Sequence, residues 1–369
     1  MDRRSVTAER VLKRTRETAK AAGKPAAAKY ACHLSGCFVP GLAQRRKMTA
    51  RARRDLASLS ICMNTATAKP RRLFFAWTAW DAIPVLMVLG HAAFLAWLFF
   101  GFHQTPWWLW VPCALIYSIS ISWSINSTSH NFIHNPFFKW AWLNRVFSFL
   151  FSLTDGFSQE FYKHVHLRHH VGNMDRVGEN GTTIDPLSIY RHGKDGKPES
   201  VWTYTFYSYF RDDIGECYTR VKKKWPHLAR WIRIEIATVV VVYLACLIYD
   251  WRAFLCLVPF YYLGHSLSSL NGYYEHLKGD PDQPIAWGVS TYNKFYNWIW
   301  LYNGFHAEHH YRPKVHWTRM VSLRDSIRDE QRVKGVHVMG WCHALGFMDR
   351  SPPAHTRIEP SAQPATRTA

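Results

Sequence analysis

Acidic residues are scarce in this 369-residue chain, which has 26 Asp and Glu against 46 Lys and Arg. Its eight cysteines form no Cys-x-x-Cys pair, which argues against an iron–sulfur site, and three of them lie inside apolar runs. We therefore expect reduced structural thiols and no disulfide framework. No internal repeat is visible. Apolar residues gather in two long regions, at about 73–157 and 232–274, as in a membrane protein with polar ends.

Four apolar stretches approach the roughly 20 residues that a helix needs to cross a bilayer. They are Ala82–Phe102, Trp107–Ile125, Ile232–Tyr249 and Ala253–Tyr274. The turn His103–Pro106 has no Lys or Arg, and the turn between the last two spans has only Arg252. Because cytoplasmic loops collect Lys and Arg, both hairpins are predicted to leave the cytoplasm and return to it. The shorter run Ala141–Leu153 is interpreted as an interfacial helix.

The predicted fold is all-α: an integral membrane protein with about four transmembrane helices in two hairpins and a cytoplasmic helical cap. Residues 73–345 are expected to form the catalytic domain. Residues 1–72 are a basic arm, and residues 346–369 are a tail rich in Pro, Thr and Ala; both are expected to be disordered. A transit peptide and a later translation start, at Met48 or Met63, remain alternatives for the arm.

Histidines recur at helical spacing in three places. The boxes are His130-Asn-Phe-Ile-His134, His166-Leu-Arg-His169-His170 and His306-Ala-Glu-His309-His310, and the element Asn271-Gly-Tyr-Tyr-Glu275-His276 adds a ninth histidine. Spacings of three and four residues place imidazoles on one face of a helix. Under the predicted topology, all nine histidines lie on one side of the membrane, at the cap.

Neutral imidazole is a good ligand for iron, zinc and copper. Nine imidazoles exceed what one metal ion uses, so two metal ions are predicted. Histidine resists oxidation better than thiolate, which suits a site that oxidises unactivated C–H bonds. A membrane metal transporter is the alternative from another class, but its ligands would lie near the bilayer midplane. A nucleic-acid-binding role for the basic arm would leave the histidines unexplained.

In their order and surroundings, these boxes resemble those of the membrane fatty acid desaturase and hydroxylase superfamily. The resemblance covers about Leu73 to Trp317, and its most specific parts are Arg168-His-His-Val-Gly-Asn173-Met-Asp175 and Asn303-Gly-Phe-His306-Ala-Glu-His309-His310-Tyr-Arg-Pro313. It implies two iron ions that activate O2 as co-substrate. The implied ligands are His130, His134, His166, His169, His170, His306, His309 and His310, with His276 as the ninth and Asn271 as its rival.

Other polar residues near the boxes are candidates for orienting the ligand imidazoles through their second nitrogen. They are Asp175, Asp185, Glu275, Glu308 and His164, with solvated loop positions as the alternative. His91 and His265 lie inside predicted spans, where a histidine that bonds to a neighbouring helix is the simpler interpretation.

The resemblance implies an oxidoreductase that introduces a double bond into a fatty acyl or related lipid chain. Hydroxylation and alkene-forming decarboxylation remain alternatives on the same scaffold. Neither paired Cys-x-x-Cys motifs nor His-Pro-Gly-Gly is present, so a separate electron donor of the ferredoxin, rubredoxin or cytochrome type is expected. The enzyme is expected in a bacterial inner membrane, with its active site on the cytoplasmic side and no nucleic-acid partner.

Overall fold

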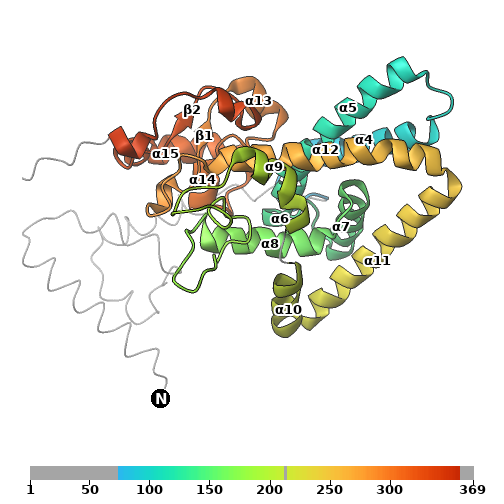
Figure 1. The fold of residues 1–369 in the computed structure, drawn as a ribbon, viewed down its shortest axis with the longest axis horizontal. Helices are drawn as coiled ribbons and strands as arrows, with labels where there is room; N and C mark the ends of the chain where they lie inside the picture. The colour runs from blue at the N-terminus through green and yellow to red at the C-terminus, as the bar shows by residue number, and fades with distance from the viewer. Residues whose placement is uncertain (1–73, 212–213, 358–369) are drawn as a thin grey trace, which may run out of the picture. The chain divides into compact units, whose positions relative to one another are not determined.

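Four long apolar helices dominate the computed structural model, which describes residues 74–211 and 214–357 (Figure 1). Each is long and apolar enough to cross a bilayer. They run over Ala79–Phe100, Trp107–His134, Pro226–Tyr249 and Trp251–His276. The four expected spans are therefore confirmed as candidates, and the second and fourth continue into the histidine elements at His134 and His276. The expected basic arm, 1–72, lies outside the described residues.

The described chain is mostly helical. The long helices comprise the 3-10 turn Ala79–Asp81 with α4 (Ala82–Phe100), α5 (Trp107–Trp123) with its continuation through α6 (His130–His134), α11 (Pro226–Tyr249) and α12 (Trp251–His276). The shorter helices are α7 (Ala141–Asp155), α8 (Gln159–Gly172), α9 (Val201–Arg211), α10 (Ile214–Lys224), α13 (Lys294–Ile299), α14 (His306–Tyr311) and α15 (Met320–Val333). Strands β1 (Ser290–Thr291) and β2 (Val338–Met339) pair in parallel, and 3-10 turns cover Pro284–Ala286, Trp317–Arg319, His343–Met348 and Ala354–Arg357.

Helices α5 and α12 pack closely because a glycine stands where they meet. A Cβ at Gly264 would lie 2.7 Å from the Cβ of Ile121, so only glycine permits this approach. The hydroxyl of Ser118 donates to the carbonyl of Phe260 at 2.8 Å. In a membrane, small residues and polar bonds of this kind hold helices together. They bring together the C-terminal ends of both candidate spans, which carry His134 and His276.

One turn of π-helix, Ser124–Ser129, joins α5 to α6. Its side chains are all buried, and Asn126 donates to Ser268 of α12 at 3.1 Å. A π-turn adds a residue to the helical turn and so rotates everything after it. The rotation sets the direction in which His130 and His134 point, which periodicity alone does not predict.

The run expected as an interfacial helix forms α7, which is shorter than the four candidate spans. Phe147 and Phe151 face the interior, whereas Trp142 and Val146 are exposed. Gly156 ends this helix with φ of 75°, and the ring of Tyr261 lies where a Cβ would be. The two-sided pattern agrees with a helix at an interface, and its position in a membrane remains a prediction.

Residues 346–357 belong to the ordered body, although a disordered tail was expected from residue 346. The ammonium of Lys278 lies 2.8 Å from Asp349 Oδ2, and His337 Nε2 lies 2.7 Å from the same oxygen. These bonds hold a segment whose composition alone indicates disorder. The rest of the expected tail, residues 358–369, lies outside the described residues.

Candidate metal centre

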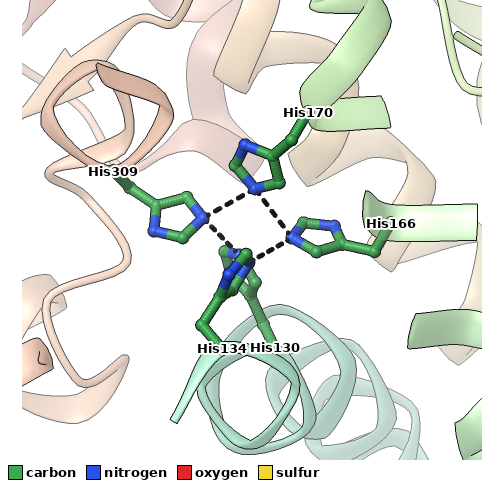
Figure 2. A group of neighbouring side chains, drawn as sticks. All are labelled: His130, His134, His166, His170 and His309. Carbon is green, nitrogen blue, oxygen red and sulfur yellow. Dashed lines mark hydrogen bonds between the residues drawn. The ribbon is translucent and has the colours of Figure 1, made fainter. Parts of the chain in front are cut away.

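Five of the predicted histidines converge through their Nε2 atoms in one cluster (Figure 2). They come from α6, α8 and α14: His130, His134, His166, His170 and His309. Nε2–Nε2 distances are 2.8 Å for His130–His309 and for His134–His166, and 3.0 Å for His170 with both His166 and His309. We call this group the first cluster.

The other four predicted histidines form a second cluster, which is entirely buried: His169, His276, His306 and His310. Nε2 of His306 lies 3.0 Å from Nε2 of His276, and Nε2 of His169 lies 3.2 Å from Nε2 of His310. In each cluster, one nitrogen from every histidine lies within 4.8 Å of the others. The structure thus brings together all nine histidines and divides the second and third boxes between the clusters.

The hydrogen bonds around the second cluster identify the protonated nitrogen of its rings. Nδ1 of His169 lies 2.7 Å from Asp185 Oδ2, and Nδ1 of His310 lies 2.7 Å from Asn173 Oδ1. The amide nitrogen of Asn173 donates elsewhere, to the carbonyl of His170, so Oδ1 accepts from His310. A neutral imidazole carries one hydrogen, here on Nδ1. The Nε2 lone pairs of His169 and His310 therefore face each other.

The same pattern recurs in both clusters. Nδ1 of His130 lies 3.1 Å from Asn303 Oδ1, and Nδ1 of His276 lies 3.2 Å from the Trp287 carbonyl. Lone pairs that face each other at about 3 Å repel, and a cation between them turns the repulsion into coordination. Acceptors on the outer nitrogen are the usual support of metal-binding histidines. The donor set therefore fits a metal ion in each cluster.

Electrostatics favours the neutral, metal-binding form of these rings. Burial, followed by the neighbouring histidines, lowers the pKa of five cluster histidines outside the candidate spans well below 6.5. These residues are His166, His170, His306, His309 and His310. Protons consequently compete weakly for the inner nitrogens at neutral pH.

Of two candidate orienting carboxylates, one bonds a cluster histidine and the other supports the loop that carries the first. Asp185 bonds His169 directly and also accepts from the backbone N–H of Met174 at 2.9 Å. In the described part of the chain, Asp175 bonds no cluster histidine; it accepts from the N–H groups of Ile184 and Asp185, at 2.6 and 2.9 Å. Asp175 thus shapes the loop that presents Asp185.

Glu275 is linked to both clusters. Its Oε2 is 3.8 Å from Nε2 of His306, and its Oε1 accepts from the side-chain amides of Asn303 and, at 2.7 Å, Asn271. Asn303 also bonds His130, so Glu275 connects to both clusters. Asn271, the rival ninth ligand, belongs to neither cluster and supports Glu275, whereas His276 lies in the second cluster.

The two remaining candidates point away from the clusters. Glu308 accepts from Ser290 Oγ and Tyr292 Oη, both at 2.7 Å, and so anchors α14 to β1. His164 lies on the opposite face of α8 from His166, with Nε2 3.5 Å from Glu160 and its ring stacked on Trp225. Neither side chain orients a cluster imidazole in this structure.

Sequence reasoning overlooked several contributors. Asn173 and Asn303 stand inside the motifs quoted for the family, but their amide oxygens received no role. His343 is wholly buried beside Glu275, and no motif marks it. Each acts across a large sequence separation, which periodicity does not reveal. His91 and His265 are held by protein partners, Ser120 Oγ at 2.9 Å and the Asp155 carbonyl at 3.0 Å.

A cavity of about 480 Å³ adjoins both clusters. Five cluster histidines line it: His130, His166, His169, His276 and His306. Its wall on α12 comprises His265, Ser268, Ser269, Gly272, Glu275 and His276. Residues from His265 to His276 span about 16 Å along the helix, at about 1.5 Å each. Apolar residues of α8 and α11, including Phe161, Val165 and Ile236, form the facing wall.

A family model described as fatty acid desaturase matches residues 105–340, which include all nine cluster histidines and three of the four candidate spans. No curated protein and no solved structure matches the chain. The match covers more than half of the chain and confirms the resemblance read from the histidine boxes. This chain belongs to the fatty acid desaturase family.

Proposed function

We propose that this protein is an O2-dependent di-iron membrane oxidase that introduces a double bond into a fatty acyl or related lipid chain. The observation that carries the proposal is the pair of histidine clusters whose inner nitrogens converge, with the facing Nε2 atoms of His169 and His310 free of hydrogen. Family membership supports an oxidoreductase that acts on lipid, and the four candidate spans support a membrane location.

In this proposal the first cluster holds one iron and the second cluster holds the other. Bound iron, supplied with O2 and electrons, provides the oxidising power to remove hydrogen from an unactivated C–H bond. The protein contributes the rest. Asp185, Asn173 and Asn303 hold the imidazoles in the metal-binding tautomer, and the buried surroundings exclude water.

The cavity is the proposed site of the acyl chain. The apolar side chains of α8 and α11 suit hydrocarbon, and His276 and His306 line the part beside Glu275. A chain that lies along α12 would present one carbon to the clusters and extend toward His265. Its position in the cavity would then select which carbon is oxidised.

We further propose that the helices form two hairpins, with the clusters in a cap on the cytoplasmic side of a bacterial inner membrane. The exposed Lys222, Lys223 and Lys224 end α10, next to the exposed Arg230 and Arg233 at the start of α11. Such a basic surface suits an acidic electron donor, which would be a separate ferredoxin, rubredoxin or cytochrome.

The test is mass-spectrometric lipid profiling of cells that express the wild-type chain, His169→Ala or His227→Ala, with hydrocarbons sampled in the headspace. His227 is an exposed histidine at the start of α11 and serves as the matched control. A product two mass units lighter, present with wild type and His227→Ala but absent with His169→Ala, is expected. A hydroxylated acid would indicate hydroxylation in place of desaturation, and a shortened alkene would indicate decarboxylation. Purified protein that binds no iron would overturn the proposal.

A further inference from the structure

Residues that follow the family match pack beside the second cluster. The match ends at residue 340, yet the following residues pack against the cap end of α12. A Cβ at Gly346 would lie 2.3 Å from Tyr274 Cγ, so this turn lies directly against α12. The pairing of Ser290 with Val338 and the bond from Lys278 to Asp349 hold the segment on either side.

His343 is the buried polar side chain of this segment that approaches the cluster. Its Nε2 lies 2.9 Å from the carbonyl of Val289, which only accepts, so Nε2 carries the hydrogen and Nδ1 is an acceptor. Nδ1 lies 3.4 Å from the hydroxyl of Tyr296 and 3.8 Å from Glu275 Oε1. The His343 ring centre is 6.0 Å from that of His306, a member of the second cluster.

A short network leads from His343 to Glu275. The Tyr296 hydroxyl has one hydrogen and lies between two acceptors, His343 Nδ1 at 3.4 Å and Asn271 Oδ1 at 3.3 Å, so it donates to one of them at a time. The amide nitrogen of Asn271 donates to Glu275 Oε1 at 2.7 Å. The backbone closes the loop, because the N–H of Val289 donates to the carbonyl of Glu275 at 2.7 Å. His343 therefore contacts two groups that lead to Glu275. One is the Tyr296 hydroxyl, next to Asn271, and the other is the backbone of Val289.

The orientation of Glu275 matters because its two oxygens have different surroundings. Oε1 accepts from two amides, whereas Oε2 faces Nε2 of His306 at 3.8 Å. That nitrogen also faces Nε2 of His276, so it points to the place a metal ion would take in the second cluster. A rotated carboxylate would remove negative charge from beside that place.

We propose that His343 is a positioning residue of the second cluster: it fixes Tyr296, Asn271 and thereby the Glu275 carboxylate beside His306. The segment beyond the family match is then part of the metal site of this protein. This inference rests on the proposed function, because it requires a metal ion bound by His169, His276, His306 and His310.

The experiment is a Co²⁺ titration of the full-length, metal-free protein in detergent, followed by the visible absorption of the bound ion. His343→Leu keeps the volume but loses both polar atoms, whereas His343→Gln keeps one donor and one acceptor. His337→Leu is the matched control, since His337 lies just before this segment and bonds Asp349 within it. His134→Ala shows which Co²⁺-binding step belongs to the first cluster, because His134 is a member of that cluster alone.

We expect His343→Leu to weaken Co²⁺ binding at the second cluster about tenfold to a hundredfold, with the first cluster unchanged. His343→Gln should recover most of that affinity, and His337→Leu should leave both steps as in wild type. Equal affinities in wild type and His343→Leu would overturn the inference. So would equal weakening by His337→Leu, which would mean that the segment acts only through docking. A wild-type protein that takes up no Co²⁺ would instead refute the metal centre of the proposed function.

Discussion

Nε2 of His169 and Nε2 of His310 lie 3.2 Å apart, and neither carries a hydrogen. Each ring instead donates outward through Nδ1, to Asp185 and to Asn173. Such an arrangement is unfavourable for two neutral imidazoles in isolation and favourable around a cation. The outer acceptors therefore decide whether the cluster is ready to bind a metal ion.

Substitution of Asp185 tests this dependence. Asp185→Asn weakens the acceptor on His169 Nδ1 and is expected to lower metal affinity about tenfold to a hundredfold, since supporting acceptors have effects of this size. Bound iron measured in competition with a chelator gives the affinity. Asp282→Asn is the control, because the Asp282 side chain is 77% exposed and pairs with Arg176, away from both clusters. Unchanged iron affinity in Asp185→Asn would contradict the role given to this carboxylate.

The low pKa of the cluster histidines predicts how metal retention depends on pH. Burial lowers the pKa of His166, His170, His306, His309 and His310 well below 6.5, so the rings gain protons only as the pH falls through those lowered values. Metal is therefore expected to stay bound at pH 6, where most free imidazole is protonated. Metal content after gel filtration at stepwise lower pH measures this. Half-release near pH 6.5 would indicate exposed, unperturbed ligands.

Filling the cavity should impair activity without loss of metal. Gly272 lines the cavity, and a Cβ there has Glu275 Oε2, at 4.0 Å, as its nearest neighbour. Gly272→Leu is expected to lower product formation from long acyl chains at least about tenfold, because its side chain occupies space proposed for substrate. Gly90→Leu is the control, since a Cβ at Gly90 meets nothing within 4 Å and Gly90 does not line the cavity. Equal product profiles for the two variants would argue against this cavity as the substrate site.

Glu235 is expected to stabilise the packing of three helices. Its carboxylate accepts from Ser148 Oγ of α7 at 2.6 Å, and from Ser158 Oγ at 2.5 Å and the N–H of Glu160 at 2.9 Å at the start of α8. Glu235→Ala leaves these buried donors unpaired and should cost about 3 kcal/mol of unfolding free energy. Thermal unfolding in detergent measures the loss. Thr238→Ala, one turn along on the same helix, should change stability by less than about 0.5 kcal/mol. A similar loss in both variants would refute a specific role for Glu235.

The candidate spans and the nine histidines were predictable because both depend on local properties. A run of apolar residues long enough to cross a bilayer is visible in any window of the chain. Box spacings of three and four residues orient imidazoles together on any helix. The end of α12 at His276 followed from the same reasoning, since the motif lies at the close of an apolar run.

The division of the boxes between clusters was not predictable. His166 and His170 join the first cluster while His169, between them, joins the second, and His309 separates in the same way from His306 and His310. Helical spacing puts neighbouring side chains at different angles, but only the packing of α6, α8, α12 and α14 decides which histidines each one meets. The π-turn before His130 also changes the direction of the first box, and propensity does not anticipate it.

By itself, the sequence determined that the chain has apolar helices long enough to cross a membrane and carries histidines of the desaturase family at helical spacing. Only the tertiary structure decided which imidazoles face one another and which nitrogen of each remains free for a metal. The physical reason is that these properties depend on acceptors far away in the chain. Asn303 reaches His130 across 173 positions, and Asn173 reaches His310 across 137. Such pairs form only when the long helices have packed.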